Sequence, residues 1–188
     1  NGAGKSTLLG CVSGTVDPDG GRVELTGQDL HARPLEARAA LRYLPQELEM
    51  PRGLTGREWL LFHAELFGAS PADARALEPG DLLAPMRASL ELLAETYSPG
   101  MRKRLAVATL LLGDGRVLVL DEPFAGVDRD GQAAIARHVA EALARGCGVL
   151  LSAHDPEEAP VAALVAELAA RGHSPSPRVF ALEPRADQ

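Results

Sequence analysis

The sequence predicts an α/β fold in which a mostly parallel sheet carries an inserted α-helical subdomain. Three observations lead to this prediction. Strand and helix patterns alternate along the chain, two apolar runs have the composition of strands buried on both faces, and the region of about 55–112 is mostly helical in pattern. We therefore expect one domain, with a core of about residues 1–54 and 113–188 and the helices inserted between its two parts.

The opening segment around Gly4-Lys5-Ser6 carries the strongest chemical signal. It matches the second half of the phosphate-binding pattern G-x-x-x-x-G-K-[ST], whose first glycine would lie before Asn1, so we expect a fragment that begins inside the motif. Backbone N–H groups of such a loop surround phosphate oxygens, and the following helix points its positive end at them. Lys5 would reach the outer phosphates, and the Ser6 hydroxyl would hold Mg²⁺. The alternative, a glycine-rich turn before an ordinary helix, is disfavoured by the apolar residues that follow.

Composition and charge limit the partners that the chain can have. Its 188 residues are 46% hydrophobic and 24% charged, which is typical of a soluble globular domain. Aromatic residues make up 4% and the net charge is -7, so we expect no nucleic-acid partner. Cys11 and Cys147 have no metal-type spacing and are expected to be free thiols in a reducing compartment. No apolar stretch approaches the ~20 residues that cross a bilayer, and the start does not resemble a signal peptide, so any membrane link would come through a partner.

Cap and turn signals predict the elements of the first part of the core. A helix over Lys5–Ser13 would end at Gly14, whose lack of a side chain suits a helix stop. The alternation of Arg22–Thr26 is typical of a half-buried strand. A short helix over Pro34–Leu41 and a brief strand at Arg42–Leu44 would follow.

The inserted region begins with a capping box, because Thr55 is followed three residues later by Glu58. In the helix that it starts, Trp59, Phe62 and Leu66 share one apolar stripe, and Gly68 would cap the end. Further helices are expected from Ser70-Pro71, over Leu82–Glu95, and from the N-cap Ser98 and Pro99 to about Leu112.

The second part of the core is again strand, helix and strand. Val117–Leu120 is a continuous apolar run, as expected for a parallel strand buried on both faces. An amphipathic helix ended by Gly146 and a second buried strand at Val149–Leu151 would follow. Asp155-Pro156 could start the last helix, although Pro160 implies a break or a delayed start, and Arg178–Leu182 is a possible edge strand.

Asp121 and Glu122 follow directly on the buried run V-L-V-L. An acidic residue at the C-terminal end of a buried strand beside a phosphate-binding loop is placed to bind Mg²⁺, directly or through water. Glu122 can then act as a general base on the attacking water. The alternative is that Asp121-Glu122-Pro123 is only a solvated helix start.

Taken in chain order, six segments resemble the motifs of the nucleotide-binding domain of ABC transporters. They are N-G-A-G-K-S-T (Walker A), Gln46 in L-P-Q-E (Q-loop), Tyr97-Ser98-Pro99-Gly100-Met101 (signature motif), V-L-V-L-D-E-P (Walker B), Ala125-Gly126-Val127-Asp128 (D-loop) and His154 in S-A-H-D (switch histidine). The resemblance covers roughly Asn1 to Glu158 and implies a P-loop NTPase with a RecA-like core. L-T-G-R-E and Y-S-x-G-M-R-K-R-L are most similar to the exporter branch of the family.

The resemblance implies ATP as ligand and Mg²⁺ as cofactor, with each ATPase site formed between two such domains packed head to tail. One subunit would bind the nucleotide through Asn1, Gly2, Ala3, Gly4, Lys5, Ser6 and Thr7. The other would present Ser98 and Gly100 to the γ-phosphate. Metal ligands would be Ser6, Gln46 and Asp121, and catalytic residues would be Glu122, His154 and Gln46.

The implied function is the ATP-binding and ATP-hydrolysing subunit of an exporter-type ABC transporter. It would work as a homodimer or heterodimer docked on a separate transmembrane permease, and would thus be cytoplasmic and peripheral on the inner face of the cell membrane. One alternative is a non-catalytic regulatory half of a heterodimer, which Pro99 keeps open although Glu122 and His154 are both present. The other is a soluble ABC ATPase without a transport role, although the tandem cassettes, coiled-coil insertions and basic arms common in that class are not seen.

The sequence departs from the family pattern at several positions, and a few further residues lie outside the six motifs. Pro99 stands where the family usually has glycine, and Val161–Gln188 fits the family poorly. The family's upstream strand and the aromatic residue that usually stacks on adenine are expected to precede this fragment. Arg102-Lys103-Arg104 is interpreted as a solvated helix face rather than an anion site, and Trp59 as a core residue rather than a permease contact. The remaining histidines are expected at the surface: His31, His63, His138 and His173.

Overall fold

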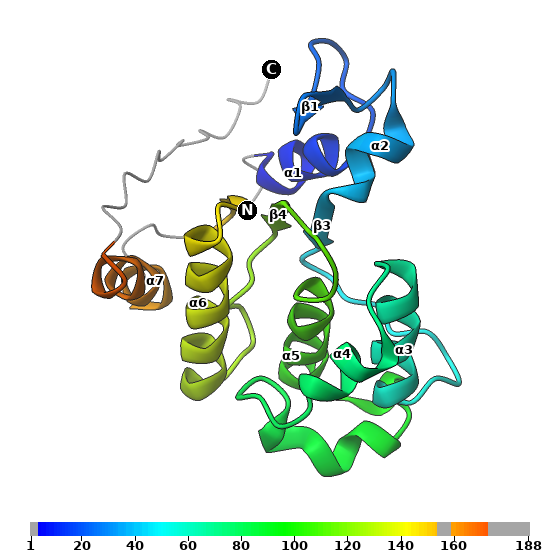
Figure 1. Ribbon diagram of the computed structural model, residues 1–188, viewed down its shortest axis with the longest axis vertical. Coiled ribbons are helices and arrows are strands. Elements are labelled where there is room, and N and C mark those ends of the chain that lie inside the picture. The colour runs from blue at the N-terminus through cyan, green and yellow to red at the C-terminus, as the bar shows by residue number, and fades with distance from the viewer. Residues whose placement is uncertain (1–3, 154–158, 173–188) are drawn as a thin grey trace, which may run out of the picture.

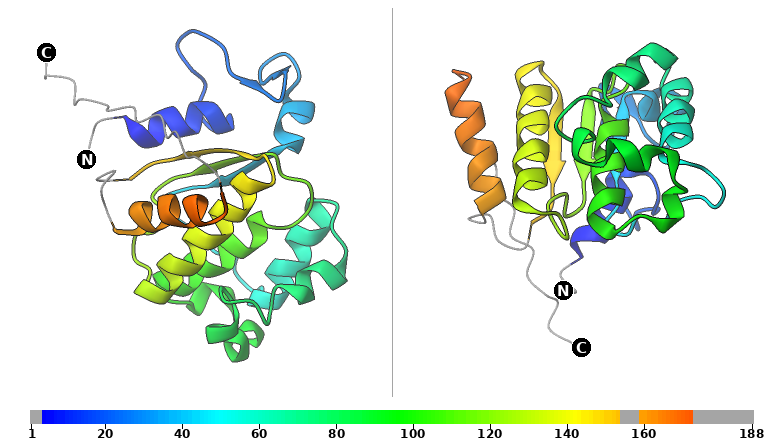
Figure 2. Two further views of the ribbon diagram at one scale, coloured as in Figure 1. Left: turned by 60° about the vertical axis from the view of Figure 1, so that its left-hand side comes forward. Right: turned by 90° about the horizontal axis from the view of Figure 1, so that it is seen from below.

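The structure, a computed structural model, describes residues 4–153 and 159–172. The residues for which we made predictions but which lie outside the described ranges are Asn1, Gly2, Ala3, His154, Asp155-Pro156, His173 and Arg178–Leu182. A parallel sheet occupies the centre, with helix α1 on one side and helices α5, α6 and α7 on the other (Figure 1; Figure 2, left). This arrangement of helices and parallel strands confirms the predicted α/β fold class.

Within the described residues the parallel sheet has the strand order β3-β4-β5. The strands are β3 (Leu41–Leu44), β4 (Val117–Leu120) and β5 (Gly148–Leu151). Leu44 pairs with Leu120, and Leu120 pairs with Leu151, so the three strands end level with one another. The segments that follow the strands thus emerge along one edge of the sheet, and this edge holds the candidate site.

Alternating side chains of β4 build two cores, one on each face of the sheet. Val119 packs with Leu9 of helix α1 in the smaller core, and Leu118 and Leu120 belong to the larger core beneath the helices. Helix α1 spans Lys5–Ser13, as predicted, and ends at Gly14 with φ 75°. Packing on both faces explains why β4 is apolar at every position.

The segment predicted as one strand over Arg22–Thr26 is instead a short hairpin. Strand β1 (Glu24–Leu25) pairs antiparallel with β2 (Gln28–Asp29), which the sequence prediction missed. Thr26 and Gly27 both have positive φ, at 50° and 80°, and this is the backbone of a tight two-residue hairpin turn. Helix α2 (Pro34–Ala39) then leads into β3.

Five helical segments fill the region between β3 and β4 (Figure 1). They are α3 (Gly56–Leu66), α4 (Pro71–Ala76), the 3₁₀ segments η1 (Ala84–Glu91) and η2 (Ala94–Thr96), and α5 (Pro99–Leu110). The predicted capping box at Thr55 and Glu58 is confirmed, with the Glu58 N–H donating to the Thr55 hydroxyl at 3.2 Å. The predicted helix over Leu82–Glu95 is wrong in type, because the chain turns through two 3₁₀ segments with an extended Leu92 between them.

The apolar stripe of α3 is not its buried face. Phe62 and Leu66 are 51% and 61% exposed, whereas Leu60 and Ala64 are each 1% exposed. Trp59 is half-buried against the larger core, as the core interpretation requires. Leu60 and Ala64 lie four residues apart and so occupy one side of the helix, beside the predicted stripe of Trp59, Phe62 and Leu66.

Two cations of α5 contradict the prediction of a solvated helix face. Lys103 and Arg104 are only 5% and 6% exposed. Arg104 donates to the carboxylate of Asp128 at 2.6 Å, and Asp128 itself caps the next helix, α6 (Arg129–Ala144). The reason is that α5 packs between α3, β3 and α6, so no side of its central turns faces solvent.

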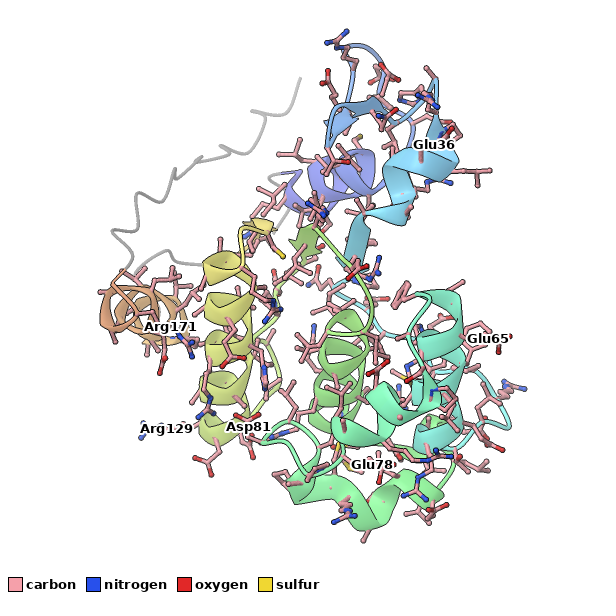
Figure 3. All side chains as sticks on the ribbon, viewed as in Figure 1. Glu36, Glu65, Glu78, Asp81, Arg129 and Arg171 are labelled. Atoms are coloured by element: carbon pink, nitrogen blue, oxygen red, sulfur yellow. The ribbon has the colours of Figure 1, made fainter. Side chains whose placement is uncertain are left out.

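Two of the histidines expected at the surface have specific partners. His138 on α6 lies 2.7 Å from the Asp81 carboxylate, in the loop before η1, and Arg137 also pairs with Asp81. Figure 3 shows Asp81 beside α6. The His63 ring lies against the Trp59 ring, with centroids 4.1 Å apart and planes tilted by 57°, and burial lowers the pKa of this imidazole.

The last described helix, α7 (Ala159–Ala170), packs along α6. Pro160 is its second residue, which bears out the predicted delayed start. Arg171, at its end, donates to the Glu141 carboxylate of α6 at 3.0 Å and lies between the two helices in Figure 3. In the part of the chain that the structure describes, no helix combines the length and apolar character needed to cross a membrane.

Candidate functional site

The start of helix α1 supplies the first functional side chains at the sheet edge. Gly4 precedes the helix with φ 78°, a left-handed conformation that glycine adopts without strain. The Lys5 ammonium reaches across the end of the sheet and donates to the backbone carbonyl of Ala153, after β5, at 3.1 Å. Ser6 and Thr7 are exposed in the first turn of the helix. The helix N-terminus and the lysine thus bring positive charge to the edge where the strands end.

A relay of hydrogen bonds links α1 to the ends of β3 and β4. The Ser6 hydroxyl donates to the side-chain oxygen of Gln46 at 3.3 Å. The side-chain amide of Gln46 then donates to a carboxylate oxygen of Glu122 at 3.3 Å. The fold thus brings together three residues from separate sequence motifs. Gln46 and Glu122, which the second bond joins, are 76 positions apart in the sequence.

Asp121 is the most deeply buried carboxylate of this cluster, at 1% exposed. One of its oxygens, Oδ1, accepts a hydrogen bond from the Ser152 hydroxyl at 2.5 Å. The other, Oδ2, has no hydrogen-bond partner among the described residues. An orphaned buried carboxylate oxygen is unfavourable unless a cation or water satisfies it. Oxygen donors from Asp121, Ser6 and Gln46 have the chemistry that Mg²⁺ prefers, so these residues fit the ion.

Glu122 has an unusual backbone. Its φ is 47°, a left-handed conformation that costs a non-glycine residue about 1–3 kcal/mol. Both of its backbone polar groups are held: the N–H donates to the Ser152 hydroxyl at 2.9 Å, and the carbonyl accepts from the Lys103 ammonium at 3.2 Å. The surrounding structure therefore enforces the bend that points this carboxylate toward Gln46.

The signature-motif residues lie on a separate surface. Ser98 is the N-cap of α5, its hydroxyl accepts from the Met101 N–H at 3.3 Å, and Pro99 is the first helical residue, as predicted. The two hydrogen bonds of the relay join Ser6, Gln46 and Glu122, and the signature-motif residues take no part in these two bonds. Instead they line an open hollow of about 520 Å³ with residues of the D-loop and of η1: Pro85, Met86, Ser89, Ser98, Pro99, Gly100, Met101, Arg104, Gly126 and Asp128.

Two residues of the site were missed by the sequence prediction, Ser152 and Lys103. Ser152 follows β5 directly, and its N–H donates to the Leu120 carbonyl, so its place beside Asp121 follows from strand register. That signal was present once V-L-V-L and V-L-L were taken as neighbouring parallel strands. Lys103 had no comparable signal, because its position depends on how α5 packs against the sheet.

Comparison with known proteins agrees with this geometry. Residues 1–125 match the family described as ABC transporter. A relative named Nod factor export ATP-binding protein I, from Paraburkholderia xenovorans, is 37% identical over 160 residues, which is 85% of this chain and 53% of the relative. The chain therefore spans about half the length of the curated relatives it matches.

Solved structures point to the same family. The ATP-binding subunit of an ABC transporter superposes with a TM-score of 0.72 at 30% identity, over 82% of this chain and 65% of that one. A dimeric ATP-binding cassette in a post-hydrolysis state, bound to ADP and phosphate, has the same fold with a TM-score of 0.70 at 18% identity, over 81% of this chain and 71% of that one. The sequence-based assignment is thus confirmed, and the chain belongs to the ABC transporter family as an ATP-binding domain.

Proposed function

We propose that this chain binds and hydrolyses ATP and that the energy drives transport through a separate membrane permease, by ATP-driven closure of a dimer. The observation that carries the proposal is the relay from Ser6 through Gln46 to Glu122, next to the orphaned oxygen of Asp121. A carboxylate, an amide and a hydroxyl at the N-terminus of a helix form a set suited to holding phosphates, a metal ion and a water molecule.

In this proposal each group has a distinct task. Lys5 and the N-terminus of α1 bind the phosphates, with the preceding residues Asn1, Gly2, Ala3, Gly4 and with Thr7. Mg²⁺, held by Asp121, Ser6 and Gln46, would supply positive charge that offsets the phosphate oxygens. Glu122 takes a proton from the attacking water, and Gln46 fixes the direction of its carboxylate. The role of His154 beside the γ-phosphate rests on the family resemblance alone.

The proposed closed state contains two domains. Ser98 and Gly100 of one copy would complete the phosphate site of the other, which agrees with their lining a hollow whose residues do not include Ser6, Gln46 or Glu122. The partner is a second copy or a related ATP-binding domain. Glu122, bonded by Gln46, argues against the non-catalytic alternative.

The permease and the location at the inner face of the cell membrane belong to the same proposal. Support comes from the relatives named export ATP-binding proteins and from the exposed Phe62 and Leu66 on α3. These side chains, of which Phe62 stacks with Trp59, offer an apolar contact on the helical subdomain of about 55–112. We keep the division of the chain into a core of about 1–54 and 113–188 and this subdomain as part of the proposal.

A direct test is Mg²⁺-dependent ATP hydrolysis by the protein expressed from its whole coding sequence. We expect Lys5→Met to weaken ATP binding by about tenfold or more, because a charge-assisted contact to the outer phosphates is lost. Calorimetry with ATP measures this effect, and Arg22→Met, an exposed cation on the hairpin side, serves as the matched control. Wild-type protein without ATP hydrolysis, or equal ATP affinity for both variants, would contradict the proposal.

Pro99 allows a test of the dimer. Proline lacks the N–H that glycine would offer to the partner's phosphate, and a hydrogen bond to a charged group is worth about 1.5–3 kcal/mol. We expect Pro99→Gly to strengthen ATP-driven dimerisation or turnover by about tenfold, with ATP affinity of the monomer unchanged. Pro71→Gly is the matched control, because Ser70-Pro71 starts α4 with the same cap-proline pair away from the site. Unchanged dimerisation and turnover in Pro99→Gly would show that Pro99 only starts the helix.

A further inference from the structure

Lys103 is a buried cation at the back of the candidate site. It lies on α5 and is 5% exposed, and its ammonium donates to the backbone carbonyl of Glu122 at 3.2 Å. The same ammonium lies 3.5 Å from the backbone carbonyl of Gln46. One side chain from a third element therefore contacts the backbones of the two residues whose side chains form the relay.

The sequence itself sets Lys103 apart. Lys5 and Lys103 are the two lysines of the chain, and arginine serves at every other Lys/Arg position. Arginine and lysine are not equivalent, because an ammonium is a compact point charge that donates in three directions, whereas guanidinium is a broad planar fork. Both lysines reach the carbonyls at this sheet edge, Lys5 at Ala153 and Lys103 at Glu122.

Burial of this cation opposes stability. Desolvation lowers the pKa of Lys103, and the nearby negative charges of Asp121 and Glu122 act in the opposite direction. A buried charge is weak evidence for stability, because an apolar side chain of similar volume often serves as well or better. The Lys103 ammonium donates to the backbone of Glu122, whose φ of 47° is the strained left-handed conformation in the site. Strain at a functional residue persists only when surrounding groups hold it.

We propose that Lys103 is a positioning residue for ATP hydrolysis, which holds the left-handed backbone of Glu122 and the loop of Gln46 so that the Glu122 carboxylate keeps its orientation. This inference rests on the proposed function. The Lys103 ammonium donates to the backbone carbonyl of Glu122, so Lys103 acts through that backbone. Because α5 begins at Ser98 and Pro99, the same helix would carry the signature motif at its start and the support of Glu122 one turn later.

The test compares Lys103→Met, which keeps the length of the side chain without the donor, with Lys103→Gln, which keeps a neutral donor. For the Met variant we expect kcat to fall about tenfold, with ATP affinity within about twofold of wild type. The Gln variant should lie between Met and wild type, because its amide restores part of the contact. Steady-state kinetics give kcat, calorimetry gives ATP affinity, and thermal melts report the folded fraction.

Arg42→Met is the matched control. Arg42 is likewise buried, at 3% exposed, and donates to backbone carbonyls, but at the start of β3, away from the site. We expect this control to lower Tm while kcat per folded molecule stays within about twofold of wild type. It therefore separates loss of a buried cation from loss of positioning.

The possible results distinguish failure of the proposed function from failure of the role of Lys103. Wild-type protein that hydrolyses no ATP would overturn the proposed function, and this inference with it. If wild type hydrolyses ATP, a Met variant with kcat reduced less than about threefold overturns the role of Lys103 alone, as do equal losses of kcat and ATP affinity. Should the Met variant not fold, the Gln variant decides: kcat equal to that of wild type, or equal losses of kcat and ATP affinity, overturns the role of Lys103.

Discussion

Glu122→Gln is expected to lower ATP turnover by about 10²–10⁴-fold while ATP binding is retained. The substitution keeps the shape of the side chain, and its amide oxygen can still accept from Gln46, which lies 3.3 Å away in the wild type. An amide takes no proton from water at neutral pH, so only the general-base step is lost. The Asp121 oxygens and the Lys5 ammonium, which bind metal and phosphate in the proposal, stay in place.

The same variant should accumulate as an ATP-bound dimer, since hydrolysis no longer releases the two subunits. Light scattering with and without ATP measures the dimer, and phosphate release measures turnover. Glu49→Gln is the control, because it makes the same chemical change at an exposed carboxylate of the segment that follows Gln46. A Glu122→Gln protein that turns over ATP as fast as wild type would exclude Glu122 as the base.

Much of the candidate site could be predicted because the register of the parallel strands determines where its residues lie. Gln46, Asp121 and Ser152 each follow a parallel strand, and parallel strands bring their C-terminal ends to one edge. The phosphate-binding sequence at Lys5 then fixes which edge matters. Local pattern was sufficient to predict Lys5, Ser6 and Asp121, whereas Gln46 was predicted from the family resemblance and Ser152 was missed although strand register places it.

What could not be predicted depends on packing between layers. The three charged residues of 102–104 have the composition of an exposed helix face, yet Lys103 and Arg104 are buried because neighbouring elements surround α5. Likewise α3 buries Leu60 and Ala64 rather than its largest apolar side chains. Helical periodicity identifies faces of a helix, but which face meets a neighbour is set by elements far away in the sequence.

Turn chemistry explains the third difference. Alternation over Arg22–Thr26 indicates one strand, whereas the chain reverses at Thr26-Gly27. Threonine is rare at positive φ, so Thr26 did not indicate a hairpin turn at this position. A favourable two-residue turn usually carries asparagine or aspartate before the glycine.

A large loss of stability is expected for Gly113→Ala, in the segment between α5 and β4. Gly113 follows α5 with φ 66°, in the left-handed region, and a Cβ built there would lie 2.2 Å from the backbone carbonyl oxygen of Phe67. Phe67 caps the end of α3, so neither backbone can retreat without moving a helix. The two segments meet at their closest approach because this residue has no side chain.

Gly113→Ala combines left-handed strain of about 1–2 kcal/mol with displacement of the α3 end, so we expect a total loss of at least about 3 kcal/mol. For a chain of this size that corresponds to a Tm lower by roughly 6–12 °C, measured by thermal melts followed by circular dichroism. Gly146→Ala isolates the second contribution, since Gly146 also has positive φ, 88°, but no atom lies within 4 Å of its added Cβ. That control should lose only the stability that left-handed strain costs, about 1–2 kcal/mol. Equal Tm values for the two variants would mean that the contact between Gly113 and Phe67 does not limit how the helical region docks on the core.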